Sequence, residues 1–292
     1  MSPRVQKWLI SGPPLVYLLI FFAIPVLIMA TASFRYPGEL GGLAPLSSSD
    51  PDELAGVTLE SYQRFFSDFI YAQLFVKSFV YAVVTTLLCL LLSYPLALMI
   101  SRSPKKYREI LVLLVILPFW SNFLIRVYAW MIILGPQWAF SRAFNGVLGM
   151  FGFEPVSLMF SPFAVLVGLV YVHLPFMVLP LYANLEKHDP TLLDAAQDLG
   201  AGTWARFWKV TFPLSLPGVY AGAALVFIPA LGIFAIPDLL GGTDSVLIGN
   251  VIKQQFLDAR DWPFGGVLSI VLTLLAILFA GLAAWVARGQ RL

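Results

Sequence analysis

Six long apolar runs, separated by polar segments, dominate the 292-residue chain. The hydrocarbon core of a bilayer is about 30 Å thick, and a helix crosses it with about 20 consecutive apolar residues. Each run is long enough, so the pattern predicts an all-α polytopic membrane protein with six transmembrane helices, in a single domain that covers residues 1–292. The predicted spans are 13–34, 75–100, 110–134, 162–185, 213–236 and 263–287.

Composition and charge place the chain in a membrane and give it an orientation. Charged residues make up 12% of the chain, whereas about 25% is typical of a soluble domain. Eleven of the 18 Lys and Arg residues fall in the two terminal segments and in the second and fourth loops. Because such residues concentrate on the cytoplasmic side, both termini and the loop 186–212 are predicted to be cytoplasmic. The opposite side holds more acids than bases, which weakly favours a cationic solute.

The N-terminal run has a second interpretation. Arg4 and Lys7 precede an apolar stretch that reaches Ala30-Thr31-Ala32, and this order also occurs in cleavable signal peptides. Pro25 and the continuation of the run to Phe34 favour a retained first span.

A polar stretch, DAAQDLGAGTWARFWKVTFPLSLPG at residues 194–218, interrupts the apolar pattern between the fourth and fifth spans. A helix is predicted to begin just before it. Its cap is either Asp189, with Pro190 as the first helical residue, or Thr191. Glycine readily adopts the left-handed conformation that closes a helix, so the helix is predicted to end at Gly200.

This short helix has a small apolar face. Ala195, Ala196 and Leu199 are predicted to share it, while Asp194 and Asp198 lie on the other side. Alanine side chains allow another backbone to approach closely, and the acids offer partners for basic side chains. The pattern indicates a docking surface, and an ordinary connector between two spans is the alternative.

The spacing of residues in the loop resembles the "EAA" loop of ABC importer permeases, which reads Glu-Ala-Ala-x3-Gly-x9-Ile-x-Leu-Pro. Here Asp194-Ala195-Ala196 is followed by Gly200, Val210 and Phe212-Pro213 at the same intervals. Three positions differ conservatively, with Asp for Glu, Val for Ile and Phe for Leu. The resemblance implies a type I (MetI-like) importer permease with six spans.

In that family the loop is the coupling helix, which seats in a groove of a cytoplasmic ATPase. The resemblance therefore implies an ATPase-coupling role for Asp194, Ala195, Ala196, Leu199 and Gly200. It also implies four kinds of partner: a second, homologous permease subunit, a dimer of ATPase subunits, an external substrate-binding protein and the lipid bilayer. No nucleic-acid partner is expected.

Three longer stretches, at residues 117–134, 168–201 and 238–265, look like the spermidine/putrescine branch of the type I importers. They imply that the solute is a polyamine. Another small cationic or amino-acid-like solute of the same importer class remains the alternative, and the resemblance leaves open whether the permease pair is a heterodimer or a homodimer.

The sequence offers no chemistry of its own for an enzyme. It contains no Gly-x-x-x-x-Gly-Lys-Ser/Thr loop, so ATP and Mg²⁺ are expected on the partner ATPase and no cofactor on this chain. No catalytic residues are expected, since Gly-x-Ser-x-Gly and His-Glu-x-x-His are both missing. His173 and His188 have no second ligand at metal-binding spacing, so no metal site is expected. An intramembrane enzyme and an autonomous channel or secondary carrier are the less favoured alternatives.

Four residues are candidates for the substrate path. Arg126 lies 16 residues after Ile110, roughly 24 Å along a continuous third span and so close to its outer boundary. It could face the path, snorkel to the headgroups or pair with an acid. Trp120 and Tyr128 could offer cation-π contacts, or belong to an aromatic belt. Asp238 could bind an ammonium group, or cap a turn beside Gly241.

Overall fold

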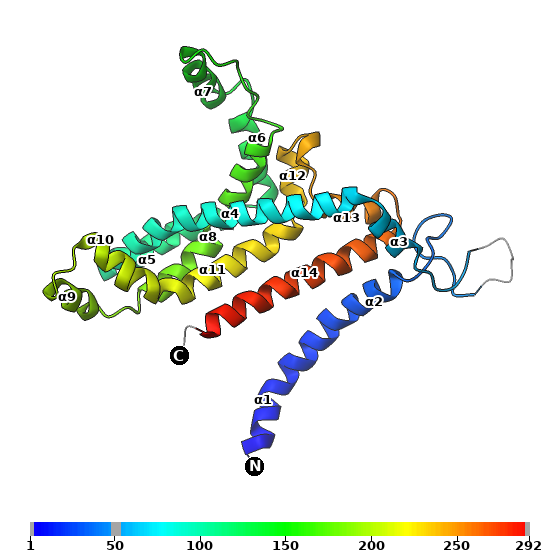
Figure 1. Cartoon of the computed structure of the whole chain (residues 1–292), viewed down its shortest axis with the longest axis horizontal. Coiled ribbons are helices and arrows are strands. Elements are labelled where there is room, and N and C mark those ends of the chain that lie inside the picture. The colour runs from blue at the N-terminus through cyan, green and yellow to red at the C-terminus, as the bar shows by residue number, and fades with distance from the viewer. Residues whose placement is uncertain (1–2, 48–53, 290–292) are drawn as a thin grey trace. The chain divides into compact units, whose positions relative to one another are not determined.

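The computed structural model describes residues 3–47 and 54–289, and it describes side chains within residues 8–47 and 54–283. In this part of the chain every regular element is a helix, and the β-bridges are isolated ones within residues 35–57 and at Asp261. Figure 1 labels the α-helices. In chain order they are α1 Pro3–Leu18, α2 Ile24–Ala32, α3 Glu60–Ser67, α4 Phe69–Arg102, α5 Lys105–Ile116, α6 Phe123–Leu134, α7 Ala139–Met150, α8 Pro162–Leu185, α9 Thr191–Asp198, α10 Thr203–Arg206, α11 Phe212–Gly232, α12 Ala235–Leu240, α13 Ile248–Leu257 and α14 Trp262–Gly289.

The contacts within the chain group it into two compact units. One consists of Met1–Gln73 with Val251–Leu275, and the other of Leu74–Asn250 with Ala276–Leu292. In the first unit α2 and the loop between α2 and α3 make contacts with the start of α14. In the first unit Arg64 forms an ion pair of 3.0 Å with Asp261 and lies over the ring of Phe264. The candidate site residues all belong to the second unit.

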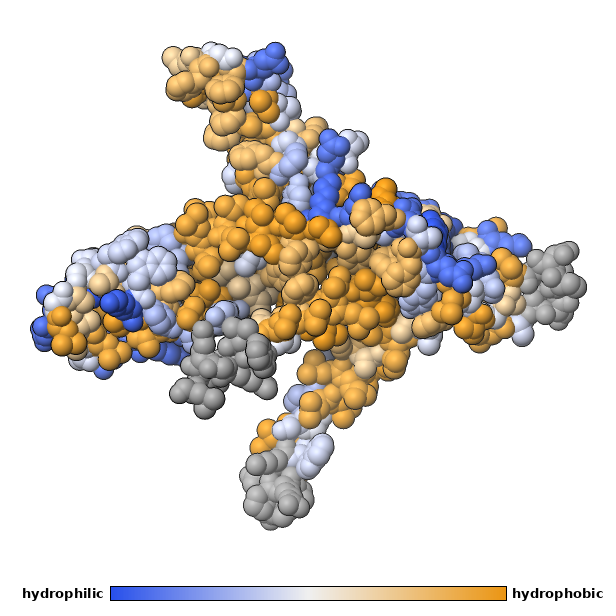
Figure 2. All heavy atoms as spheres, in the orientation of Figure 1, coloured by the Kyte–Doolittle hydropathy of each residue, from blue (hydrophilic) through white to orange (hydrophobic). Residues whose placement is uncertain are grey.

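Six helical stretches are long and apolar enough to cross a membrane, among the residues that the structure describes: Trp8–Ala32, Phe69–Arg102, Phe123–Met150, Pro162–Leu185, Thr203–Gly232 and Trp262–Ala283. The fifth begins ten residues before the predicted 213 because α10 continues through a π-helical turn at Phe207–Thr211 into α11. It ends at Gly232, four residues before the predicted 236. Figure 2 shows apolar side chains along α4 and α11, and a mixture of polar and apolar ones at the end that carries α9 and α10.

The third predicted span, 110–134, is not one continuous helix. α5 ends at Ile116, a 3-10 turn follows at Leu117–Trp120, and α6 leaves in a different direction (Figure 1). The break has a local cause, because Pro118 has no N–H to donate to the carbonyl of Leu114. The side chain of Asn122 then caps α6 by accepting from the N–H of Leu124 at 2.8 Å.

The two halves of the broken span pack against opposite ends of α8. Leu111 and Val115 of α5 join the cluster around Leu181 and Leu185, near the C-terminal end of α8. Val127 and Leu134 of α6 join another cluster, which includes Val165 near the N-terminal end of α8. Residues 110–134 therefore run the length of α8, with the break near its middle.

The closest helix pair of the second unit is α8 with α11. Gly218 and Gly222 of α11, four residues apart, face α8. A Cβ at Gly218 would stand 2.7 Å from the Cβ of Asn184 and 3.1 Å from the carbonyl oxygen of Pro180. Small residues at this spacing let two membrane helices approach closely, which maximises the dispersion contacts that hold them together in lipid.

A side chain at Gly218 would force these helices apart. We expect Gly218→Leu to destabilise the protein by about 1–3 kcal/mol, the usual range for overpacking, and thus to lower the melting temperature of the detergent-solubilised protein. Gly281→Leu is the matched control, since a Cβ there meets no atom within 4 Å. Equal melting temperatures for the two variants would contradict the close packing.

Candidate coupling helix and substrate path

The helix α9 connects α8 to α10 and α11, and its start is fixed by an aspartate. The Asp189 carboxylate accepts the N–H of Thr191 at 3.0 Å, and this hydrogen bond lowers the pKa of Asp189. Pro190 already has helical dihedral angles. Of the two predicted caps, the structure therefore has Asp189, and Thr191 is a helical residue.

Gly200 closes α9 in the way that the sequence predicts. Its φ of 79° is left-handed. The N–H of Gly200 donates to the backbone carbonyl oxygen of Gln197 at 2.8 Å, and the N–H of Ala201 donates to that of Ala196 at 2.9 Å. This pair of bonds is the Schellman motif. A Cβ at Gly200 would meet no atom within 4 Å. Glycine is therefore favoured here by the left-handed backbone and not by crowding from neighbouring atoms of this chain.

The apolar face of α9 differs from the predicted one. Ala195 and Leu199 are exposed, and Leu199 is 89% exposed, but Ala196 is half-buried together with Leu193. The exposed apolar stripe is completed by Leu192, which sequence reasoning missed although the i, i+3, i+7 spacing with Ala195 and Leu199 is visible in the sequence. Asp194 is also exposed beside the stripe.

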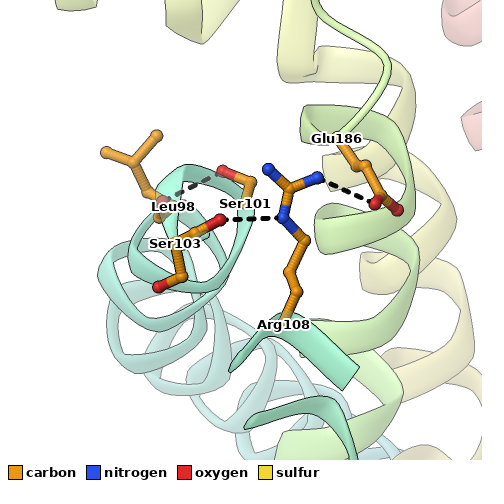
Figure 3. Close-up of polar contacts among 5 residues, drawn as sticks. All are labelled: Leu98, Ser101, Ser103, Arg108 and Glu186. Atoms are coloured by element: carbon orange, nitrogen blue, oxygen red, sulfur yellow. Dashed lines mark hydrogen bonds and ion pairs between the residues drawn. The ribbon is translucent and has the colours of Figure 1, made fainter. Parts of the chain in front are cut away.

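Side-chain bonds hold α9 to the ends of its neighbours. Arg206 of α10 donates to the side-chain oxygen of Gln197 at 2.6 Å. At the end of α8, Arg108 forms an ion pair of 3.0 Å with Glu186 and donates to the carbonyl oxygen of Ser103 at 3.1 Å (Figure 3). A cavity of about 380 Å³ lies beside this ion pair, between the end of α4 and the segment that leads into α9.

The guanidinium of Arg126 lies over an aromatic ring and not beside an acidic side chain. Its guanidinium carbon lies 4.6 Å from the centre of the Phe119 ring. Within the described residues, the ion pairs of the second unit do not include Arg126. Trp120 and Tyr128 are exposed, Trp120 to 76%. The structure thus places the three predicted residues on one broken span, without joining them to Asp238.

Asp238, in α12, is held by an asparagine that sequence reasoning missed. Asn250 is buried and donates to the carboxylate of Asp238 and, at 3.0 Å, to the carbonyl oxygen of Phe234. Its own side-chain oxygen accepts the N–H of Leu247 at 3.0 Å. A lone Asn within the apolar run IGNVI is the signal that could have revealed it. Asp238 itself is exposed, with its carboxylate oriented by this network.

Comparison with known families decides what kind of protein carries these features. Residues 70–292 match the family model described as "Binding-protein-dependent transport system inner membrane component". The chain belongs to this family. It is a multi-pass inner-membrane permease subunit of an ABC importer, a transport component rather than an enzyme.

Curated relatives of the permease show the same relationship. It is 46% identical to the spermidine/putrescine transport system permease protein PotB of Haemophilus influenzae, over 76% of this chain and 77% of that protein. PotB of Escherichia coli K12 is also 46% identical, over 74% of this chain and 78% of that protein. The inner membrane ABC transporter permease protein YdcU of Escherichia coli K12 is 29% identical over 76% and 74%.

Solved structures share the fold of the permease at low identity. A chain from a bacterial ABC transporter involved in the import of the acidic polysaccharide alginate superposes with a TM-score of 0.66 and 18% identity, covering 97% of this chain and 96% of that one. A chain of the MetNI methionine ABC transporter gives a TM-score of 0.55, also at 18% identity, covering 76% and 96%. The predicted fold class, a six-helix type I importer permease, is confirmed.

Gly200 allows a test that separates backbone strain from contact with a partner. We expect Gly200→Val to reduce ATP-driven transport by the assembled complex at least tenfold, because a β-branched residue is strained at positive φ and would unwind the end of α9. Gly200→Asn should retain most of the transport, since Asn tolerates the left-handed conformation. Equal transport by the two variants would show that the end of α9 is not required.

The ion pair of Glu186 predicts a dependence on pH. Hydrogen bonds from Tyr182 and then from Arg108 lower the pKa of Glu186 below its ordinary value of 4.5. Folding therefore gains stability from this carboxylate above pH 4.5, and loses it as the pH falls through the lowered pKa. We expect Glu186→Gln to lower the melting temperature modestly at pH 7, and the difference from wild type to shrink as the pH falls below 4.5. A difference that grows on acidification would contradict this assignment.

Proposed function

We propose that this permease forms half of the translocation path of an ATP-driven importer for polyamines, delivered by an external binding protein. The observation that carries the proposal is the 46% identity to permeases named for spermidine and putrescine transport, over three quarters of the chain. A likeness at that level favours retention of the substrate class.

Features of the second unit support a cationic solute. The exposed carboxylate of Asp238 is oriented by Asn250, and a fixed carboxylate binds an ammonium group with less loss of side-chain entropy than a mobile one. Trp120 and Tyr128 expose ring faces along the broken third span, and such faces attract ammonium groups by cation-π interaction.

We further propose that energy enters through α9. In the assembled importer its stripe of Leu192, Ala195 and Leu199 would seat in a groove of one subunit of an ATPase dimer, with Asp194 and Gly200 at the contact. ATP and Mg²⁺ would be bound by that ATPase, and a second, homologous permease would supply the other half of the path. Closure of the ATPase dimer would move α9, and the spans attached to it would alternate between inward and outward access.

An amino-acid-like solute is the second candidate. The observation that favours it is the unpaired guanidinium of Arg126 in the first turn of α6. Both a guanidinium and the positive end of a helix dipole attract a carboxylate. Transport of a zwitterion with no transport of amines would select this candidate.

Uptake by reconstituted vesicles tests the proposed function. We expect vesicles that contain the full complex and its binding protein to accumulate labelled spermidine or putrescine only with internal ATP. We expect Leu199→Glu, which alters an exposed side chain, to abolish uptake and ATPase association, whereas Leu257→Glu, an exposed control outside the coupling loop, should have no such effect on ATPase association. Uptake without any ATPase would contradict the proposal. If an ATP-hydrolysing complex moves neither amine, the polyamine assignment is wrong.

A further inference from the structure

The guanidinium of Arg126 has an unusual environment. Among the residues that the structure describes, its buried Nε and Nη1 atoms have no hydrogen-bond acceptor, and the guanidinium carbon lies 4.6 Å from the centre of the Phe119 ring. Burying a charged donor without an acceptor costs free energy. The residue also lies in the first turn of α6, where the helix dipole disfavours a positive charge. Stability alone therefore does not account for an arginine here.

The Arg126–Phe119 pair lies beside the middle of the spanning helix α8. Phe119 belongs to the 3-10 turn that breaks the span, and its ring packs edge-on against Phe176 at 5.4 Å. Phe176 neighbours His173, and both lie near the middle of α8. The expected position of Arg126 assumed a continuous third helix, whereas the break turns α6 away from the direction of α5 (Figure 1).

This cluster has an open side. The side chains of Phe119 and Arg126 are half-buried, and that of Phe176 is 41% exposed. A charged group at this depth is costly against lipid tails, so polar groups within spans face a protein partner or a water-filled path. In transporters, helices interrupted at mid-membrane commonly mark the substrate site.

We propose that Arg126 is a tethered cation that occupies the ring face of Phe119 when no substrate is present, and that an ammonium group of the substrate takes its place during passage. The proposal rests on the proposed polyamine substrate. Both cations seek the same electron-rich face, and two positive charges repel strongly in a low-dielectric site. Substrate can therefore bind only as the guanidinium leaves, which makes Arg126 a specificity-determining residue.

The test is equilibrium binding of labelled spermidine to the complete complex in lipid nanodiscs, without the binding protein. Arg126→Met keeps an unbranched side chain but removes the competing charge, so we expect it to tighten binding by about two- to thirty-fold, the range of one cation-π contact. Phe119→Leu removes the ring, so it should reverse this tightening in the Arg126→Met background. It should change binding little when Arg126 is present, because the guanidinium and the ammonium group then exchange one contact for another. Arg126→Met should then have no further effect in the Phe119→Leu background.

Two further variants separate this role from a structural one. Arg126→Lys retains the cation and should bind spermidine within about twofold of wild type. Arg142→Met removes an exposed arginine that is bonded to Gln137 instead, and should leave binding unchanged. If Arg126→Met fails to assemble, Arg126→Gln, which also removes the charge, takes its place in both comparisons.

The proposal is overturned if Arg126→Met weakens binding or leaves it unchanged, or if Phe119→Leu fails to weaken binding in the Arg126→Met background. Uptake by the wild-type complex is measured in parallel. If the wild-type complex imports amines and the variants, Arg126→Met included, bind them as tightly as wild type, the inference about Arg126 is wrong but the polyamine assignment stands. A wild type that hydrolyses ATP but neither binds nor imports amines overturns the polyamine assignment and this inference together.

Discussion

The close packing of α8 against α11 is the constraint on which the rest of the second unit depends. In lipid no hydrophobic force drives helices together, so their association relies on van der Waals contact and on hydrogen bonds. Gly218 and Gly222 let α11 approach the backbone of α8, and the hydroxyls of Tyr94 and Ser215, 2.8 Å apart, join α4 to the pair. Because α9 is connected at one end to α8 and at the other, through α10, to α11, a displacement of α9 acts on a tightly packed pair.

The same pair reaches the candidate substrate residues. Phe176, on α8, contacts the ring at the break of the third span, and α11 leads after Gly232 into α12, which carries Asp238. Both features depend on interrupted helices, and interruptions within a membrane persist only where protein groups or water satisfy the backbone. Side chains satisfy some of these backbone groups. Asn122 accepts the N–H of Leu124 at the start of α6, and Asn250 bonds to the backbone of Phe234 and Leu247. The breaks thus place polar groups between spans that are otherwise apolar.

Local rules in the sequence were enough to predict much of this arrangement. The six apolar runs gave the fold class, and the end of α9 at Gly200 followed from the left-handed preference of glycine. The break at Leu117–Trp120 was not predicted, because hydropathy is the same for a broken and a continuous apolar run, and Pro118 alone does not decide between a kink and a break. Asn250 and Phe176 were missed for a different reason: their roles depend on partners distant in sequence. Ala196 was assigned to the exposed face because periodicity does not show which side a neighbour covers.

Accessibility of Leu199 tests the central claim, that α9 is the surface through which the permease receives work from an ATPase. The single cysteine of the chain, Cys89, is buried, so Leu199→Cys would add one reactive thiol. The measurement is its rate of modification by a water-soluble maleimide in inside-out vesicles, with and without the ATPase subunits. Leu257→Cys, predicted to lie on the opposite side, is the control for vesicle sidedness and should stay unmodified. The account predicts rapid modification of Leu199→Cys without the ATPase and strong protection with it. Equal rates in both preparations would contradict it.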